Sequence, residues 1–185
     1  MYYLTTLTEN VSVPPRRFGE PLDQVILELC RTKFENSVSP EYGIIISVIE
    51  IQTLTQGRIV PGDGATHHEV KFRALAFKPL QNEVVRGEVV ETAKYGVFIR
   101  LGCTDALCHI SQLSDDHFIL SSQGLLTSRE QGLRLSIGDS VRGRIITSNV
   151  DHTSMKIAIT MKHDYLGSDE WIEGKLETTE QKKDK

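Results

Sequence analysis

The chain has 185 residues, of which 39% are hydrophobic and 25% charged, and its formal net charge is −4 with histidine neutral. This balance is typical of an ordinary soluble protein with room for one large or two small domains. No apolar run reaches the about 18 residues that a membrane span needs, and residues 1–6 show no basic region before an apolar stretch. We therefore expect neither a membrane span nor a secretory signal.

The cysteines are three in number, Cys30, Cys103 and Cys108, and no two of them form a C-x-x-C pair. This odd set argues against a disulfide framework and against a zinc site. It indicates a reducing compartment, so we expect a cytoplasmic protein. We also expect no bound metal and no cofactor.

Residues 1 to 80 predict a small α+β domain, with one helix on a small antiparallel sheet in an RNP-like arrangement. Residues 2–11 indicate a strand, and a helix is expected from about residue 21 to residue 37, with Pro21 at its first position. The runs 43–51 and 70–79 predict two more strands, the first of them central. One face of the helix carries an apolar stripe at helical spacing: Leu22, Val25, Ile26, Leu29, Cys30 and Phe34.

A glycine-rich segment separates these two strands. Gly62 and Gly64 flank Asp63, but no G-x-x-x-x-G-K-[ST] pattern and no strand-to-helix context accompany them, so a nucleotide-binding loop is not indicated. His67 and His68 are adjacent in a predicted strand and would point to opposite faces, which argues against a two-histidine metal site. The segment predicts a tight turn, in which a glycine is required if φ is positive.

Residues 81 to 163 predict an all-β barrel, because short β-branched runs alternate there with polar turns. A single helical turn is expected at residues 110–113, after the third run. The expected strands are five: 84–91, 96–101, 105–108, 141–146 and 156–160.

An aromatic pair lies at the start of the second of these strands. Tyr95 and Phe98 are three residues apart, which would place them on opposite faces of a regular strand. Gly96 between them can relieve this, because a glycine in a strand often marks a bulge that redirects a side chain. The two rings could then share one face.

Five short motifs follow one another along this part of the chain: Gly87-Glu88-Val89, Lys94-Tyr95-Gly96-Val97-Phe98-Ile99, His109-Ile110-Ser111, Ile137-Gly138-Asp139-Ser140-Val141 and Lys156-Ile157-Ala158-Ile159-Thr160. Their order and spacing resemble the S1 family. The resemblance implies an OB-type barrel whose aromatic face binds single-stranded RNA. It assigns the RNA contacts to Tyr95, Phe98, His109, Asp151 and Lys156. The alternative is that the aromatic pair belongs to the core, that His109 serves the fold, and that the charged loop is merely solvated.

The predicted barrel is electrically neutral, since residues 81–163 hold nine Lys or Arg and nine Asp or Glu. A neutral domain lacks the strong counterion-release contribution that drives non-specific nucleic-acid binding. Any RNA contact should therefore be modest and should rest on stacking, which contributes ~1–3 kcal/mol per base.

Residues 113–135 form an insertion that is longer than a bare barrel of this kind needs. It holds several large apolar side chains, so either it folds back on its own barrel or it meets a partner. Residues 164–185 are expected to form a C-terminal tail, whose last dozen polar residues should be disordered. The apolar side chains in question are Phe118, Ile119, Leu120, Leu125 and Leu126.

Two further motifs make the resemblance more specific. They are Val11-Ser12-Val13-Pro14-Pro15-Arg16-Arg17-Phe18-Gly19 and Pro61-Gly62-Asp63-Gly64-Ala65-Thr66-His67-His68-Glu69-Val70. Together with the S1 pattern they resemble the E prime family of archaeal RNA polymerase subunits, the counterpart of the seventh subunit of eukaryotic RNA polymerase II. The resemblance implies a non-catalytic subunit whose first domain, the tip, docks on the polymerase core near the base of the clamp. The S1 domain would contact nascent single-stranded RNA, and a small partner protein called F would complete a stalk heterodimer.

The docking element implied for the tip domain is the turn of Gly62, Asp63 and Gly64. The alternative for the whole chain is a stand-alone S1 RNA-binding protein of translation or RNA decay. A nuclease is not indicated, because no clustered carboxylates of the metal-site type occur in the sequence.

Overall fold

A computed structural model describes residues 1–121 and 124–174, and the chain divides into two compact units. Met1–Lys78 form the first unit, with which the loop Val150–Ser154 is grouped. Pro79–Asn149 and the chain from Met155 onward form the second unit. Within the described ranges no helix is long and apolar enough to cross a membrane.

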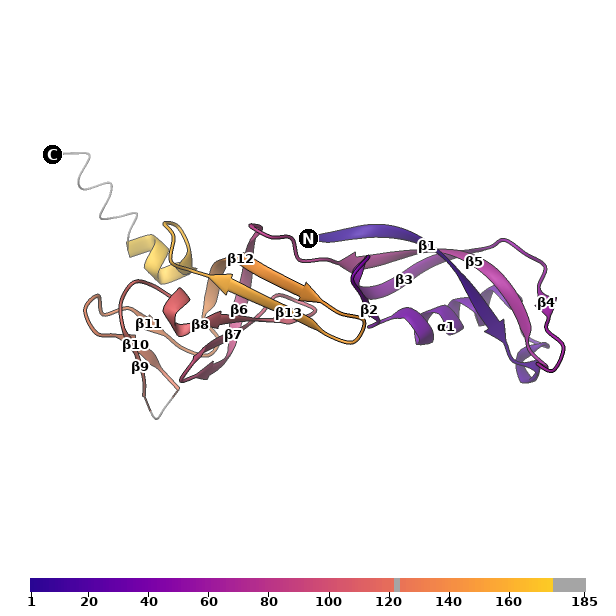
Figure 1. Ribbon diagram of the computed structural model, residues 1–185, viewed down its shortest axis with the longest axis horizontal. Helices are drawn as coiled ribbons and strands as arrows, with labels where there is room; N and C mark the ends of the chain where they lie inside the picture. Colours follow the sequence, from indigo (N-terminus) through magenta and orange to yellow (C-terminus); the bar gives the residue numbers. More distant parts are fainter. Residues whose placement is uncertain (122–123, 175–185) are drawn as a thin grey trace. The chain divides into compact units, whose positions relative to one another are not determined.

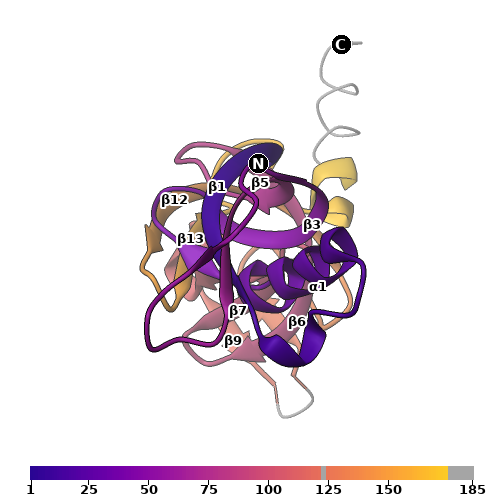
Figure 2. The ribbon, with the colours of Figure 1, turned by 90° about the vertical axis from the view of Figure 1, so that its right-hand side faces the viewer.

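The first unit is one antiparallel sheet covered on one face by one helix, which confirms the predicted α+β fold (Figures 1 and 2). The strand order is β1-β5-β3-β2, and β4 pairs with β5. The 3-10 turn Pro15–Arg17 and the helix α1, Leu22–Phe34, follow the first strand. The strands are β1 (Tyr2–Val13), β2 (Val38–Ser39), β3 (Gly43–Thr53), β4 (Arg58–Ile59) and β5 (Thr66–Phe77).

The core of this unit lies between α1 and the sheet. Along β5 every second side chain, from Val70 through Phe72 to Ala74, is buried, because alternate residues of a strand face the helix. The predicted helix stripe supplies the other side through Val25, Ile26, Cys30 and Phe34, while Leu22 is 40% exposed and Leu29 only half-buried.

The helix begins one residue after, and ends three residues before, the predicted bounds. Pro21 lies before the helix in an extended conformation and its carbonyl accepts the first helical hydrogen bond, from Val25 N at 3.1 Å. The helix ends at Phe34 because Glu35 is extended and Asn36 has a φ of 64°. The fixed φ of proline suits the position before a helix as well as the first helical position, so Pro21 alone does not fix the boundary.

Residues 43–51 lie in an inner strand, as predicted. β3 pairs with β5 along most of its length and with the two-residue β2 on its other side, and β5 is the other inner strand, between β1 and β3. β3 reads as a continuous apolar run because its register shifts twice, between Ile45 and Ser47 and between Val48 and Glu50. Such bulges turn successive side chains and remove the strict alternation of a strand.

The second unit contains a closed five-stranded barrel, which confirms the predicted S1/OB class. The strand order is β13-β8-β7-β6-β12, and β12 also pairs with β13, which closes the barrel. β13 runs parallel to β8, with Ile157 opposite Ala106. The short β14 (Gly167–Ser168) adds to β12. The barrel strands are β6 (Val84–Ala93), β7 (Gly96–Arg100), β8 (Asp105–His109), β12 (Ser140–Val150) and β13 (Met155–Thr160).

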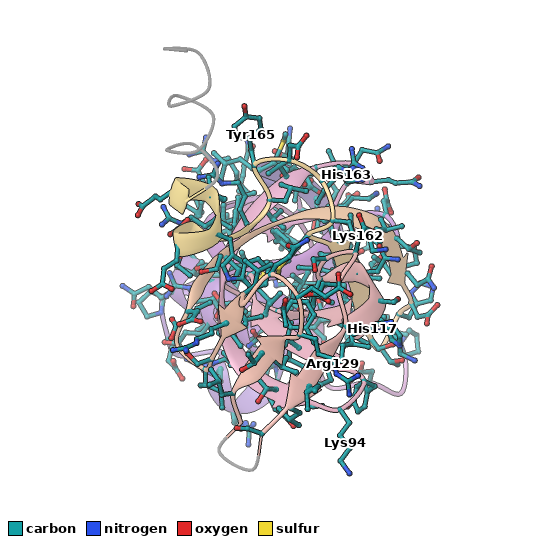
Figure 3. The ribbon with its side chains drawn as sticks, turned by 90° about the vertical axis from the view of Figure 1, so that its left-hand side faces the viewer. Lys94, His117, Arg129, Lys162, His163 and Tyr165 are labelled. Carbon is teal, nitrogen blue, oxygen red and sulfur yellow. The ribbon has the colours of Figure 1, made fainter. Side chains whose placement is uncertain are left out.

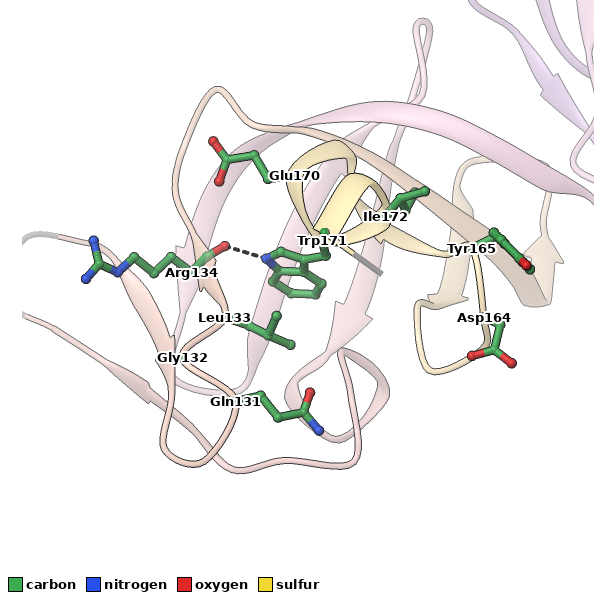
Figure 4. A pocket seen from close by; sticks show the side chains of 10 residues that line it. Gln131, Gly132, Leu133, Arg134, Asp164, Tyr165, Glu170, Trp171 and Ile172 are labelled. Carbon is green, nitrogen blue, oxygen red and sulfur yellow. Dashed lines mark hydrogen bonds between the residues drawn. The ribbon is translucent and has the colours of Figure 1, made fainter. Parts of the chain in front are cut away.

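The insertion forms a three-stranded sheet of its own, made of β9 (Phe118–Leu120), β10 (Leu126–Ser128) and β11 (Arg134–Leu135). Its apolar side chains are covered by the segment that follows the barrel. Trp171 stacks on Phe118 with ring centroids 5.9 Å apart and donates its indole N–H to the Arg134 carbonyl at 2.8 Å (Figure 4).

The fold-back alternative therefore holds for the centre of the insertion, where Phe118 and Leu126 are buried, while Ile119 stays 50% exposed. Residues 169–174 of the predicted tail are helical and place Trp171 and Ile172 in the core, each 7% exposed. The disorder expected for the last dozen residues concerns positions that, from residue 175 onward, lie outside the described residues.

Candidate nucleic-acid interface

The rings of Tyr95 and Phe98 meet on the outside of the barrel. Their centroids are 6.2 Å apart and their planes stand at 89°, an edge-to-face contact. Tyr95 lies in the turn before β7 and is 53% exposed, and Phe98 is half-buried on β7. Because Tyr95 precedes the strand, the alternation of strand side chains does not apply to it.

Gly96 brings the rings together in a different way from the predicted bulge. A Cβ on Gly96 would lie 2.3 Å from the carbonyl oxygen of Cys108, so the glycine allows β7 and β8 to approach closely. The bulge of this hairpin lies instead in β6, between Val89 and Glu91. The sequence therefore identifies the glycine that lets the two rings meet, but the reason is close strand packing and not a bulge at Gly96.

His109 ends β8 directly opposite Gly96 in the strand register. Its Nδ1 accepts the backbone N–H of Ser111 at 3.2 Å and lies 2.8 Å from the Ser111 hydroxyl, so the imidazole caps the 3-10 turn Ile110–Gln112. With Nδ1 as the acceptor, the ring proton of the neutral imidazole is on Nε2, which can donate to a ligand. Ile110 N donates to the Tyr95 carbonyl at 2.9 Å and ties the two elements together.

A groove of about 730 Å³ runs along the outer face of the barrel beside this pair. Phe98, Leu107 and Ala158 contribute apolar side chains from β7, β8 and β13, because alternate residues of these strands face outward. Lys156 lines the same groove from β13. An apolar floor with a cation beside it suits a stacked base and its phosphate.

Asp151 stands apart from the other predicted RNA contacts. It lies in the loop Val150–Ser154, where its N–H donates to the Ser154 carbonyl at 2.9 Å, and it does not line the groove. Within the second unit, the ring of Tyr95 therefore contacts the ring of Phe98, and Phe98 and Lys156 line the same groove.

The charged residues that line the groove balance, since Arg100 and Lys156 are matched by Glu91 and Asp105. Arg100 lines it from β7, but its guanidinium donates to both carboxylate oxygens of Asp105, at 3.0 and 3.2 Å, and Asp105 lines the groove too. Asp105 raises the pKa of Arg100 further above its usual range by this hydrogen bond and by its charge. Lys156 takes part in no ion pair within residues 1–121 and 124–174. Sequence reasoning missed the Arg100–Asp105 pair.

Lys94, Arg129 and Lys162 are cations of this unit that do not line the groove. Figure 3 shows them with His117, His163 and Tyr165 on one side of the unit, and all six are exposed. One of the cations, Lys162, is held by the carboxylate of Asp115 at 2.8 Å.

A second hollow, of about 740 Å³, lies beside the insertion and is lined by Leu133, Arg134, Tyr165 and Trp171, among others (Figure 4). It is as large as the groove, but its Trp171 is buried against Phe118 and presents no free ring face. We place the candidate interface at the groove because two aromatic rings, those of Tyr95 and Phe98, meet beside it, whereas the second hollow has the single exposed ring of Tyr165. The described ranges contain no group of three or more His, Cys, Asp or Glu that could hold a metal ion.

The turn predicted as the docking element connects β4 to β5 in the first unit. Asp63 organises it by accepting Ala65 N at 3.0 Å and by pairing with His67 Nε2 at 2.8 Å, and these contacts lower the pKa of its carboxyl. Gly62 has a φ of +89°, so the position that favours glycine is Gly62. Gly64 has no positive φ and approaches Pro15 instead, its added Cβ lying 3.4 Å from Pro15 Cγ.

Sequence reasoning missed two apolar side chains beside this turn. Ile59, on β4, is 72% exposed and Val60, which follows it, is 47% exposed. Exposed apolar side chains next to each other are typical of a contact surface. The available signal was the β-branched pair itself, which stands directly before Pro61 and the glycines.

A one-helix α+β unit followed by an OB-type barrel with accessible aromatic rings defines a class of two-domain, nucleic-acid-associated proteins. Comparison with known families makes this specific. Residues 8–64 match the SHS2 domain found in the N terminus of Rpb7p/Rpc25p/MJ0397, and residues 78–160 match the S1 RNA binding domain.

Relatives match over nearly the full length. DNA-directed RNA polymerase subunit Rpo7 of Saccharolobus shibatae is 37% identical over 175 residues, which cover 93% of this chain and 97% of that protein. The Rpo7 subunit of Sulfolobus acidocaldarius is 34% identical over 93% of this chain and 95% of its own length. DNA-directed RNA polymerase II subunit rpb7 of Schizosaccharomyces pombe is 29% identical over 90% of this chain and 98% of its own length.

The chain belongs to the Rpo7/Rpb7 family of DNA-directed RNA polymerase subunits. The matches extend through both units, so they favour a polymerase subunit over a stand-alone S1 protein of translation or RNA decay.

Proposed function

We propose that the chain is a non-catalytic stalk subunit of a cytoplasmic DNA-dependent RNA polymerase. In this proposal the first unit docks on the large core subunits near the base of the clamp, and the small stalk partner called F binds along both units. The barrel contacts the nascent single-stranded RNA. The non-catalytic role follows from the family resemblance, which places the active site on the large subunits.

The observation that carries the RNA part is the accessible ring pair beside an apolar groove on an S1 barrel. Tyr95 and Phe98 stack on bases, because every base offers a π-face to an aromatic side chain. The Nε2–H of His109 donates to a base edge or a phosphate, and Lys156 neutralises one phosphate. Asp151, in the loop between β12 and β13, is the fifth proposed contact.

RNA binding by the full chain tests this part. The variant Tyr95→Ala/Phe98→Ala/His109→Ala should weaken binding of a labelled oligouridylate by ~1–3 kcal/mol for each base that loses its stack. Tyr165→Ala is a matched control, since Tyr165 is 57% exposed against 53% for Tyr95 and lies elsewhere on the unit. Unchanged affinity of the triple variant, or an equal loss in the control, would contradict the assignment of this face.

The docking part rests on the turn of Gly62, Asp63 and Gly64 and on the exposed Ile59 and Val60 beside it. Burial of these apolar side chains against another polymerase chain would stabilise the complex by roughly 25 cal/mol per Å² of apolar area removed from water.

Incorporation into polymerase tests the docking part. Ile59→Asp should reduce the amount of this protein that co-purifies with the core, because a charge cannot be buried there without a partner. Ile49→Asp, at a side chain of the same unit that is 45% exposed on β3, is the control. Equal incorporation of both variants would show that the turn is not a docking element.

A further inference from the structure

Arg100 and Asp105 occupy one row of a ladder along the outer face of the barrel. β7 and β8 are antiparallel, and their register pairs Gly96 with His109, Phe98 with Leu107 and Arg100 with Asp105. Each row is two residues from the next, about 7 Å along the strands. The guanidinium therefore lies one row beyond the ring on which a base would stack.

A nucleotide stacked on Phe98 carries its phosphate at the edge of that ring, within reach of the neighbouring rows. Both Arg100 and Asp105 line the groove, and their side chains are 57% and 40% exposed. The two nitrogens of Arg100 that would grip a phosphate, Nε and Nη2, are those that donate to the Asp105 carboxylate at 3.0 and 3.2 Å.

The charges around Arg100 reinforce this arrangement. Asp105 faces it from β8, and Glu88 is its register partner on β6, so carboxylates flank the guanidinium on both neighbouring strands. Lys156, on β13, is the other cation that lines the groove. A phosphate approaching Arg100 therefore meets one positive charge between two negative ones.

We propose that Asp105 limits the RNA affinity of the groove by holding the Arg100 guanidinium away from the RNA phosphates. The inference rests on the proposed RNA contact and adds a residue that sets its strength. An exposed ion pair is weak, so it does not lock the arginine by its own stability, but the carboxylate repels a phosphate at the same place. The groove then binds by stacking and by one phosphate contact.

Such restraint suits a transcript that moves past its binding surface. Stacking on aromatic rings tolerates every base, and a small number of phosphate contacts lets each nucleotide leave as the next arrives. A bidentate arginine clamp on the backbone would oppose this release.

The pair also closes a hairpin, since Leu101 N donates to the Thr104 carbonyl between the two residues. A purely structural role therefore has to be separated from the proposed one. Loss of a structural contact lowers the melting temperature, whereas release of Arg100 changes the salt dependence of RNA binding, which hairpin stability does not set.

The test measures fluorescence anisotropy of a labelled oligouridylate of about 16 nucleotides, the upper end of the site size of one OB fold. The full chain is compared with Asp105→Asn, Asp105→Ser and Arg100→Gln/Asp105→Asn. Asp115→Asn is the matched control, because Asp115 also pairs with a cation, Lys162 at 2.8 Å, but does not line the groove.

Asp105→Asn and Asp105→Ser should bind RNA about two- to fivefold more tightly at low salt, the range that corresponds to an exposed charge pair. The slope of log affinity against log salt should steepen by roughly 0.7, the value for one added phosphate contact to a single strand. The variant that also lacks Arg100 should return to the wild-type affinity and slope, and Asp115→Asn should equal the wild type.

Unchanged binding by folded Asp105 variants would overturn the inference, and so would an equal gain in Asp115→Asn, which would make total charge the cause. Loss of RNA binding in Tyr95→Ala/Phe98→Ala together with no effect at Asp105 would overturn this inference and leave the RNA contact standing. RNA binding that survives removal of both rings would instead overturn the proposed RNA face.

Discussion

Gly96 and Cys108 lie so close that a Cβ on the glycine would meet the carbonyl oxygen of Cys108 at 2.3 Å. The same Cβ would lie 3.0 Å from the Cα of His109. This close approach holds the turn that carries Tyr95 against the end of β8. The ring contact and the histidine cap therefore depend on a glycine at position 96.

The first prediction concerns this position. Gly96→Ala should lower the free energy of unfolding by about 1–3 kcal/mol, since the clash is with backbone that cannot rotate away. Thermal and urea unfolding followed by circular dichroism measure the loss. Gly19→Ala is the control, because Gly19 has no positive φ and a Cβ there meets no atom within 4 Å. Similar unfolding free energies for the two variants would contradict the close packing of β7 on β8.

The second prediction concerns Asp116, which holds the insertion together. Its carboxylate accepts the hydroxyl of Ser128 and the backbone N–H groups of His117, Glu130 and Gln131, at 2.6, 2.8 and 3.0 Å for the three N–H groups. These bonds, the one from Ser128 foremost, hold its pKa well below the usual range. A carboxylate of this kind stabilises the fold above its unfolded pKa, and the contribution is lost as pH falls toward the folded pKa.

Asp116→Asn should therefore melt at a lower temperature than the wild type at neutral pH, and the difference should shrink as pH falls below about 4, the ordinary range of a carboxyl group. Melting curves across this pH range measure it. Asp115→Asn gives the comparison, because the carboxylate of the neighbouring Asp115 pairs with the Lys162 ammonium at 2.8 Å. If the difference in melting temperature between Asp116→Asn and the wild type did not change with pH, the charge of Asp116 would not be its cause.

The third prediction concerns Trp171, whose ring covers the insertion. Trp171→Ala should lower the free energy of unfolding by about 3–5 kcal/mol, as expected when a buried aromatic side chain is removed. Trp171→Phe keeps a ring against Phe118 but loses the hydrogen bond to the Arg134 carbonyl, and it should cost about 1 kcal/mol. Circular dichroism in urea distinguishes the two. An alanine variant as stable as the wild type would mean that the insertion does not need this cover.

The fourth prediction separates the two roles of His109. Asn is a preferred residue at the position before a helical turn, so His109→Asn should keep the bond to Ser111 N, whereas His109→Ala should lose it. Both variants should bind RNA more weakly, since neither has the ring, but the alanine variant alone should melt at a lower temperature. If His109→Asn bound RNA as well as the wild type, the imidazole would serve the fold only.

Strong local patterns made the main elements predictable. The stripe of α1 and the alternation of Val70 and Phe72 follow directly from helix and strand periodicity. The position of a strand within its sheet is harder to predict. Apolar residues indicate which face of a strand is buried, but they do not indicate which strands it pairs with. β5 is central although Lys71 and Arg73 face solvent, since one face of the sheet has no helix on it.

The features that were not predicted depend on contacts between residues that no local sequence pattern connects. Trp171 lies far along the chain from Phe118, and no local pattern connects a tail residue to an insertion. The pairing of Arg100 with Asp105 depends on the length of the turn between β7 and β8, which decides which side chains stand opposite each other. The order of the motifs located the ring pair at the candidate site, and the geometry revealed the ion pair beside it.

Closure of the barrel by β13 has a consequence for biosynthesis. β1 of the first unit pairs with β5, so that sheet is complete once Phe77 has left the ribosome. β8 must wait for Ile157 to supply its parallel neighbour, and β13 also completes the pairing of β12. A nascent chain between these two points carries a finished first unit and a barrel with open edges, the state in which strands aggregate most readily. Nascent chains held at this stage should therefore aggregate more than nascent chains from which β13 has also left the ribosome.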